Sequence, residues 1–535
     1  MLLSILILVT SAIGALATPW HHTPDRPIAL TTNGLILGKT STLLNTTEQI
    51  NSFLGIPFAS RPARFSPPRP PRRRLTPLSA TTYGPSCIQQ FNYPEASRNQ
   101  TIAIFNTPPP PAGESEDCLT LNIWAPAGKS KDGKPRAVLF WLYGGALMFG
   151  SGSLRGYDGT SFVLNQDVVL VTSNYRTNVF GFPGASDLPA DARNLGWLDQ
   201  RLALSWIRRN IHAFGGDPKR VTIFGESAGG ASVDALITLP PNPLPFHAAI
   251  MQSGDSSIND RADDTGASWT KLVDLAGCAG SRKRDTLRCM RRLPAVKIKE
   301  IIERNALSFG PVHDRVTYAA HPQGRRVNST EETPLIARVP LMIGSNARDA
   351  WPLVSAELND TQAYLRASFP TFTDAQRGEI LAAYPVSPAS GIRSANEQIA
   401  VIATEHGFQC PSKLIGDATS EIGVPAWRYY FNASFPNTQI FPGSGAYHSS
   451  EIGLVFGTYR QQGATGFQSE LSRFMQKAWA DFAKDPAAGP GWGAVTDVGV
   501  LGAWGEDGPV TVRTVGGEVV DSRCALFEEL YAAAL

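Results

Sequence analysis

Residues 221–230 read Val-Thr-Ile-Phe-Gly-Glu-Ser-Ala-Gly-Gly, an apolar run that ends in a turn of small residues with a serine inside it. The run favours a buried strand, and the residues from Ala228 to Ile237 favour a helix. Gly225–Gly229 therefore fits a G-x-S-x-G nucleophile elbow, whose tight strand-to-helix turn holds the serine hydroxyl clear of the sheet. In a chain with 49 glycines, an ordinary glycine-rich turn is the alternative. The flanking strand and helix favour the elbow, with Ser227 as nucleophile.

Short apolar runs alternate with helix-like segments from about residue 137 onward. The runs are Ala137–Leu142, Val168–Val171, Val221–Phe224, Ala248–Met251, Leu341–Ile343 and Trp427–Phe431. Between two of them, Asp199–Phe214 carries apolar residues at roughly helical spacing. The alternation predicts an α/β fold with a mostly parallel sheet covered by helices on both faces. We expect one domain over residues 18–535, with helical insertions around 255–340 and 352–425 that cap the sheet edge.

The overall charge balance argues against a strongly charged partner. The 535 residues carry a formal net charge of +2, which gives no electrostatic reason to expect nucleic acid or acidic lipid. The basic cluster of Arg69 and Arg72-Arg73-Arg74 lies among prolines, and we interpret it as a solvated irregular segment. No C-x-x-C pair or H-E-x-x-H helix occurs, so we predict neither a metal site nor a cofactor.

The ends of the chain and its cysteines indicate secretion. Residues 1–17 are apolar and end in Ala15-Leu16-Ala17, which is typical of a signal peptide. Nothing later in the sequence is long and apolar enough to predict a membrane span. Five N-x-S/T sequons fit passage through a glycosylating pathway: Asn45, Asn99, Asn328, Asn359 and Asn432. Six cysteines fit an oxidising compartment; spacing suggests a Cys278–Cys289 bridge and leaves Cys87, Cys118, Cys410 and Cys524 unpaired by this criterion.

A serine nucleophile needs a general base, and five histidines follow Ser227. His448 lies in the small-residue loop Gly443–Glu451, just before the apolar Ile452–Phe456, and such a loop can bring an imidazole over a strand end. The other four are His247, which opens a predicted strand, and His313, His321 and His406, in segments that we expect to be less ordered. We therefore predict His448 as the base.

Donors for an oxyanion are expected in a glycine-rich turn after an early strand. Tyr143-Gly144-Gly145-Ala146 follows the apolar run Ala137–Leu142 and fits this description. A phosphate-binding loop is the alternative. Because no G-K-[ST] sequence follows, we disfavour that interpretation.

Several collinear motifs resemble the type-B carboxylesterase/lipase (cholinesterase-like) family of α/β-hydrolases over nearly the whole mature length. The motifs are Phe53–Ala59, Arg64-Phe65, Ser115–Asn122, Asn174-Tyr175-Arg176, Asp199-Gln200, Asn210-Ile211, Phe214–Pro218 and the Ser227 elbow. The leader, the sequons and the style of the motifs are similar to those of fungal, secreted members.

The resemblance implies a role for each matching residue. Ser227 matches the nucleophile, His448 the base, and Asp349 the acid in a G-x-N-x-D-E-G stretch, where Asp replaces the usual Glu and Arg348 replaces the usual neighbouring acid. The remaining matches are Gly145, Ala146 and Ala228 as oxyanion-hole amides, and Glu226 and Glu451 as supporting carboxylates. The disulfides implied in the same way are Cys87–Cys118, Cys278–Cys289 and Cys410–Cys524.

The predicted function is secreted carboxylic ester hydrolysis through an acyl-enzyme, without a cofactor. The alternatives are a catalytically inactive binding or adhesion protein on the same fold, and an acyltransferase. Among hydrolases, a lipase or sterol esterase is possible, although prolines interrupt the Cys87–Cys118 loop where an amphipathic lid is expected. Choline esters are disfavoured, because cholinesterases carry a cation-binding Trp roughly where this chain has Thr107–Pro111.

Overall fold

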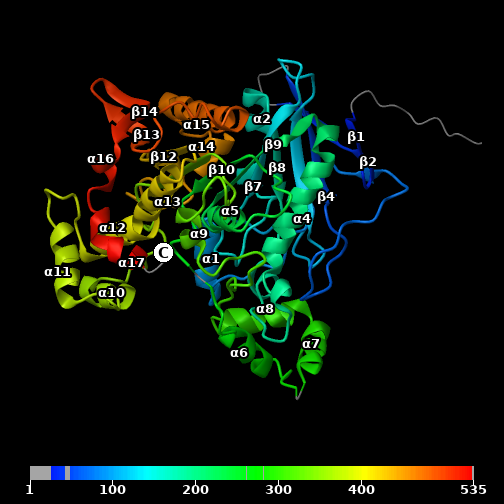
Figure 1. The fold of residues 1–535 in the computed structure, drawn as a ribbon, viewed down its shortest axis with the longest axis horizontal. Helices are drawn as coiled ribbons and strands as arrows, with labels where there is room; N and C mark the ends of the chain where they lie inside the picture. The colour runs from blue at the N-terminus through cyan, green and yellow to red at the C-terminus, as the bar shows by residue number, and fades with distance from the viewer. Residues whose placement is uncertain (1–25, 43–47, 261, 281, 533–535) are drawn as a thin grey trace, which may run out of the picture.

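A computed structural model of the chain describes residues 26–42, 48–260, 262–280 and 282–532. The predicted signal peptide and Asn45 lie outside the described residues. The main sheet has eleven strands in the order β14-β13-β12-β11-β10-β9-β7-β8-β6-β4-β3 (Figure 1). Its strands are β3 (Lys39–Thr42), β4 (Gln49–Pro57), β6 (Thr120–Pro126), β7 (Arg136–Leu142), β8 (Val169–Ser173), β9 (Gly216–Glu226), β10 (Ala248–Gln252), β11 (Leu341–Asn346), β12 (Ala426–Phe431), β13 (Asp497–Gly505) and β14 (Gly508–Gly516).

The centre of this sheet is parallel from β8 through β13, and the edge strands β6, β4, β3 and β14 are antiparallel. A second sheet contains β1 (Ile28–Thr31), β2 (Gly34–Leu37) and β5 (Leu78–Ser79). All six apolar runs of the sequence form central strands. The predicted α/β fold with a mostly parallel sheet is therefore confirmed.

The helices surround the sheet and extend away from it (Figure 1). They are α1 (Glu95–Ile104), α2 (Thr160–Gln166), α3 (Asn178–Gly181), α4 (Leu195–Asn210), α5 (Ala228–Thr238), α6 (Ala267–Leu275), α7 (Lys283–Arg292), α8 (Ala295–Arg304), α9 (Pro322–Val327), α10 (Thr361–Ser368), α11 (Asp374–Ala383), α12 (Ala395–Thr404), α13 (Cys410–Glu421), α14 (Ile452–Phe456), α15 (Gly466–Lys484), α16 (Gly517–Asp521) and α17 (Glu528–Ala532). Among the described residues, no helix combines the length and apolar character needed to cross a membrane.

Strand β7 shows why helices cover both faces of the sheet. Every residue of β7 is buried, because successive side chains enter different cores. Leu139 and Trp141 pack into a core with residues of α2, α14 and α15. Val138 and Phe140 pack into a second core with residues of α4, α5 and α13. A strand buried on both faces reads as a continuous apolar run, which is the pattern that the sequence shows.

The two insertions form separate lobes with cores of their own (Figure 1). Between residues 255 and 340, α6, α7 and α8 bury a cluster that includes Trp269, Met290 and Ile298. Between residues 352 and 425, α10 and α11 pack with the C-terminal residues Cys524 and Phe527. Helix α13 differs from its neighbours, because its Ile415 packs against the main sheet.

Three disulfides join the six cysteines: Cys87–Cys118, Cys278–Cys289 and Cys410–Cys524. These are the pairs that the resemblance implies. The expectation that His406 lies in a less ordered segment is wrong. His406 lies in η4 (Glu405–Gln409), a π-helical turn between α12 and α13, and it contacts the rings of Phe369 and Phe527.

Candidate active site

Ser227 lies between the end of β9 and the start of α5, with φ 55° and ψ −123°. This backbone conformation is strained for a residue with a side chain, so the neighbouring groups must hold it in place. The amide N–H of Ser227 donates to the carbonyl of Gln252 at 2.8 Å, and its own carbonyl accepts from Ala231 N–H. The two bonds therefore hold the Ser227 backbone in this conformation.

Close backbone contacts explain the glycines around Ser227. A Cβ atom on Gly229 would lie 1.9 Å from the carbonyl oxygen of Leu142, and one on Gly225 would lie 2.6 Å from the backbone of Gly229. On the other side, a Cβ on Gly254 would lie 2.0 Å from the carbonyl oxygen of Ser227. Helix α5 and strands β7 and β10 approach each other too closely for any side chain at these positions.

Asp349 and His448 come together although 99 residues separate them in the chain. Asp349 follows β11, at the carboxyl edge of the sheet, and its Oδ1 lies 2.9 Å from Nδ1 of His448. Its Oδ2 accepts hydrogen bonds from Ser253 Oγ at 2.9 Å and from the Asn346 amide at 2.6 Å. Both side chains of the pair are buried. Three partners thus fix the carboxylate against the imidazole.

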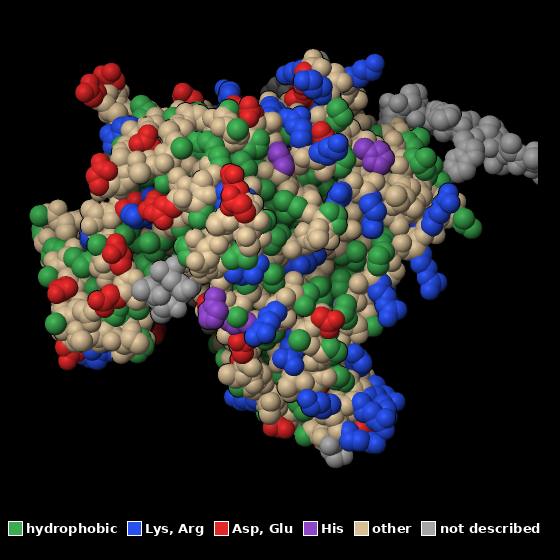
Figure 2. All heavy atoms as spheres, viewed as in Figure 1, with side chains coloured by type: hydrophobic (Ala, Val, Ile, Leu, Met, Phe, Trp, Pro, Cys, Tyr) green, Lys and Arg blue, Asp and Glu red, His purple; other side chains and the backbone are tan. Residues whose placement is uncertain are grey.

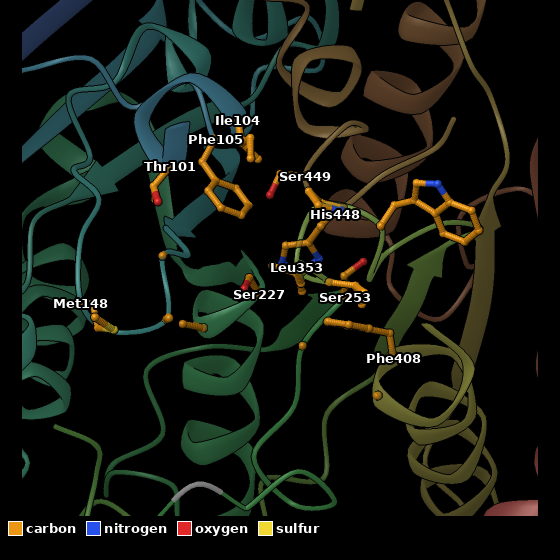
Figure 3. Close-up of a pocket in the computed structure, with 18 of the residues that line it drawn as sticks. Thr101, Ile104, Phe105, Met148, Ser227, Ser253, Leu353, Phe408, His448 and Ser449 are labelled. Atoms are coloured by element: carbon orange, nitrogen blue, oxygen red, sulfur yellow. The ribbon is translucent and has the colours of Figure 1, made fainter. Parts of the chain in front are cut away.

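Ser227 and His448 face the same cavity (Figure 3). Within the described part of the chain, no hydrogen bond joins the Ser227 hydroxyl to the imidazole. In ligand-free hydrolases this contact is often long and tightens when substrate binds. Ser227 and His448 therefore share one cavity, and Asp349 contacts the imidazole at Nδ1.

Gly145 and Ala146, in the turn after β7, line the same cavity. Gly145 has φ 101° and Ala146 has φ 55°. A Cβ on Gly145 would lie 2.4 Å from the carbonyl oxygen of Phe149, which excludes larger residues. Among the described residues, no acceptor pairs with the amides of Gly145, Ala146 or Ala228. These unpaired donors could bind an oxyanion.

Two buried glutamates complete the polar surroundings. Glu226 Oε1 lies 3.3 Å from Nε2 of His448 and accepts from Ser449 Oγ at 2.5 Å. Glu451 accepts from Gln252 Nε2 at 2.9 Å and from Asn346 Nδ2 at 2.6 Å. Through Asn346, Glu451 anchors the end of β11, just before Asp349. The glutamates thus contact different parts of the site.

The charges of this group are coupled. Burial alone lowers the pKa of His448, but the carboxylates of Glu226, Asp349 and Glu451 outweigh it and raise the pKa above its ordinary value. Burial also raises the pKa of Glu226. A proton on Glu226 removes one of the charges that favour imidazolium, so the two groups compete for a proton.

A cavity of about 1210 Å³ opens above Ser227. Its walls come from α1, from the turn after β7 and from both insertions. Phe408 of η4 and Phe105 contact the His448 ring, with centroids 5.0 Å and 6.4 Å away, respectively (Figure 3). Sequence patterns did not identify either residue as a contact of His448. Ser253 was also missed, although Gln252-Ser253-Gly254 directly follows a predicted strand.

Four of the predicted glycosylation sites lie among the described residues. Asn99, Asn328, Asn359 and Asn432 are exposed, as attachment of a glycan requires. Their modification stays a prediction. In the described ranges, no group of three or more His, Cys, Asp and Glu side chains could hold a metal ion.

The family follows from a comparison with known sequences. A profile of the carboxylesterase family matches residues 25–490. The chain belongs to the carboxylesterase family. Its relatives include an acetylcholinesterase of Bungarus fasciatus, with 33% identity over 471 residues that cover 82% of this chain and 76% of that protein. Secreted lipase 5 of Gibberella zeae is 31% identical over 485 residues, which cover 83% of each chain.

A third relative is the chlorogenic acid esterase of Aspergillus niger, with 32% identity over 460 residues that cover 83% of this chain and 80% of that protein. The predicted family is therefore confirmed, and with it the α/β-hydrolase fold. This carboxylesterase is a carboxylic ester hydrolase. The named substrates of the relatives differ widely, so family membership alone does not select an ester.

Proposed function

We propose that Ser227, His448 and Asp349 hydrolyse esters through an acyl-enzyme in a secreted protein. The observation that carries this proposal is the 2.9 Å contact between Asp349 Oδ1 and His448 Nδ1, beside a strained serine in the same cavity. Neutral His448 accepts the Ser227 proton at Nε2 while Oγ bonds to the ester carbon. The amides of Gly145, Ala146 and Ala228 donate to the resulting oxyanion.

His448 next acts as an acid when the alcohol leaves, and then again as a base toward water. The intermediate expels the alcohol, whose oxygen takes the proton from His448, and the acyl group stays on Ser227 Oγ. Water then enters, gives a proton to His448 and bonds to the acyl carbon. Collapse of this intermediate releases the acid and returns the proton to Ser227. Asp349 stays ionised and orients the imidazole throughout.

Replacing the nucleophile tests the assignment. We expect Ser227→Ala to lose at least about 10⁴-fold in kcat on a short-chain nitrophenyl ester and to lose labelling by a fluorophosphonate. Ser308→Ala is the matched control, because Ser308 also lines the cavity but contacts none of the proposed reacting groups. It should retain activity and labelling. Full turnover in Ser227→Ala with an intact fold would overturn the proposal.

The cavity supports an ester with an apolar group larger than acetate. Phe91, Phe105, Phe149 and Phe408 are among its lining residues, and its volume of about 1210 Å³ accepts a bulky group. The ring of Trp351, also in the lining, is already covered by the guanidinium of Arg348 at 4.6 Å. A choline head group would have to displace that cation.

A pair of substrates of equal shape tests the preference for uncharged esters. Acetylthiocholine and 3,3-dimethylbutyl thioacetate differ in charge but hardly in size. We expect kcat/KM to be higher for the uncharged ester. A higher value for acetylthiocholine would contradict the preference and leave the hydrolytic mechanism intact.

Three disulfides and the name of one relative, a secreted lipase, support secretion. Expression of the full chain in a fungal host should give protein in the medium that begins after Ala17. Protein retained in the cell with residues 1–17 attached would contradict this part of the proposal.

A further inference from the structure

The second sheet presents an apolar surface to solvent. In β1 the inward side chains are Ala29 and Thr31, while Ile28 is 50% and Leu30 70% exposed. The cross-strand partners of this outer pair are Leu37 and Leu35 of β2, so aliphatic side chains occupy all four outer positions. Strands with one solvated face normally place polar residues there.

A further leucine is exposed beside this sheet. Leu75 is 97% exposed and directly follows Arg72-Arg73-Arg74. The Arg74 amide donates to the Asn33 carbonyl at 2.9 Å, and Asn33 Nδ2 donates to the Pro71 carbonyl, also at 2.9 Å. These bonds fix the arginine run against the turn between β1 and β2. Exposed apolar side chains and cations therefore share one surface.

The positive charge continues along the chain from residue 74 back to residue 61. Arg61, Arg69, Arg72 and Arg73 are exposed, and this stretch contains no acidic residue. Arg64, at its far end, donates to the carbonyl oxygens of Met290 and Leu293. The stretch thus connects the β1–β2 turn to α7.

Helix α7 adds a second group of cations. Arg282 directly precedes α7 and is exposed. The exposed basic residues within the helix are Lys283, Arg284, Arg288, Arg291 and Arg292. Asp285 is the acidic residue among them. Arg208 and Arg209 at the end of α4 are exposed close to the β1–β2 turn, because the neighbouring Asn210 accepts from the Thr32 amide.

Figure 2 shows the consequence on the face of the molecule that it draws. Lys and Arg side chains gather along one edge of the molecule, from the region of β1 and β2 down to α7. Asp and Glu side chains gather mainly on the opposite side, around β14 and α10. The net charge of +2 therefore conceals an uneven distribution.

We propose that this edge docks the enzyme on an anionic lipid surface. The basic residues supply attraction to the head groups, and Ile28, Leu30 and Leu75 supply side chains that can enter the apolar boundary. A nucleic acid or an acidic polysaccharide would use the charges but would leave the aliphatic side chains in water. The combination of both features favours lipid.

Removal of charge is the first test. It uses the Ser227→Ala protein, so that no lipid is hydrolysed, and mixed vesicles of phosphatidylcholine and phosphatidylserine. We expect Arg72→Gln with Arg73→Gln to weaken binding roughly 30-fold, since each cation near such a surface contributes about five-fold. Arg366→Gln with Arg473→Gln is the matched control, because both residues are exposed on other parts of the molecule. It should bind like the parent.

Removal of apolar side chains separates lipid from other polyanions. We expect Leu30→Ser with Leu75→Ser to weaken vesicle binding by about ten-fold or more and to leave binding to heparin unchanged. Val386→Ser with Val519→Ser is the control, since these valines are 48% and 61% exposed elsewhere. The same substitutions in the active protein should leave hydrolysis of a soluble nitrophenyl ester unaltered, which shows that each variant folds.

Three results would overturn the proposal. The first is that the parent protein does not bind vesicles. The second is that the test and control variants lose vesicle binding equally. The third is that the leucine substitutions leave vesicle binding unchanged while heparin competes for the site. The last result would assign the edge to a soluble polyanion. Because the assay uses a protein without the nucleophile, its outcome is independent of the catalytic assignment.

Discussion

Asp349 reaches His448 although an aspartate side chain is one methylene shorter than the glutamate usual in the family. Asn346 N–H, at the end of β11, and Ser253 Oγ, just after β10, both donate to Oδ2 and hold the carboxylate in place. A buried carboxylate with three partners has little freedom to rotate. The shorter side chain therefore keeps the 2.9 Å contact that orientation of the base requires.

The pH dependence of catalysis should report on Glu226. The proposed base must be neutral, and the charge of Glu226 is the largest single effect that raises the pKa of His448. Glu226→Gln removes that charge but keeps an acceptor for Ser449, so the pKa of His448 should fall. Activity is lost as pH drops below this pKa, so the acidic limb of kcat/KM should move to lower pH by roughly one unit or more.

A control for this prediction is Glu357→Gln, which removes an exposed carboxylate from the cavity wall without a contact to His448. Its acidic limb should stay close to that of the wild type. A limb that stays in place, or moves to higher pH, in Glu226→Gln would show that Glu226 does not raise the pKa of the base.

At the residue scale, sequence patterns selected the proposed reacting groups but not the residues that support them. Ser227 and His448 were predicted from local motifs, and the family resemblance added Asp349. Ser253 hydrogen-bonds Asp349 across 96 residues, and no periodicity connects the two positions. Contacts of this kind depend on how strands β10 and β11 align in space, which residue type and spacing do not encode.

At the scale of elements, the elbow depends on backbones in direct contact. Gly229→Ala would place a methyl group 1.9 Å from the Leu142 carbonyl oxygen, and rigid strand and helix cannot both yield. We expect a loss of about 3 kcal/mol in the free energy of unfolding, together with lower kcat. Chemical denaturation and initial rates measure the two effects.

The matched control lies in α11, where a Cβ on Gly378 would meet nothing within 4 Å. Gly378→Ala should raise the free energy of unfolding by about 0.5–1 kcal/mol, because it stiffens the unfolded chain. Equal effects of the two substitutions would contradict the proposed crowding at the elbow.

Strands and helices could be predicted from the sequence where all of their residues are buried. The central strands read as continuous apolar runs because helices cover both of their faces. The turn η4 was not predicted from the sequence, because its residues Glu405–Gln409 mix charged, polar and aromatic types without a repeat. Its order comes from distant partners: Arg523 and Tyr384 bind Glu405, and Tyr531 binds the His406 carbonyl.

For the molecule as a whole, the Cys410–Cys524 bridge is the longest cross-link. It spans 114 residues, whereas Cys278–Cys289 spans 11. Closing a longer loop removes more entropy from the unfolded chain, so replacing both cysteines of the long bridge by serine should cost about 2 kcal/mol more than the same change in the short one. Denaturation curves of the two double variants provide the comparison. A larger loss for the short bridge would contradict the loop-entropy account.

The distribution of charge over the surface could not be predicted from the amino-acid sequence alone. Arg69 and Arg72–Arg74 were interpreted as a solvated irregular segment because they lie among prolines. Folding brings α7, some 200 residues away, against the same stretch through Arg64 and Arg291. Net charge is a sum over the chain, and only the fold determines where its contributions lie.

The residues that line the cavity suggest how the substrate specificity of the enzyme can change. Ser227 and Asp349 adjoin sheet strands that tolerate little alteration, whereas much of the lining belongs to the two insertions. Exchange of an insertion between related enzymes should therefore change which esters are accepted. The proposed catalytic residues would stay the same. Libraries for directed evolution should accordingly concentrate on residues 255–310 and 352–408 and spare the sheet.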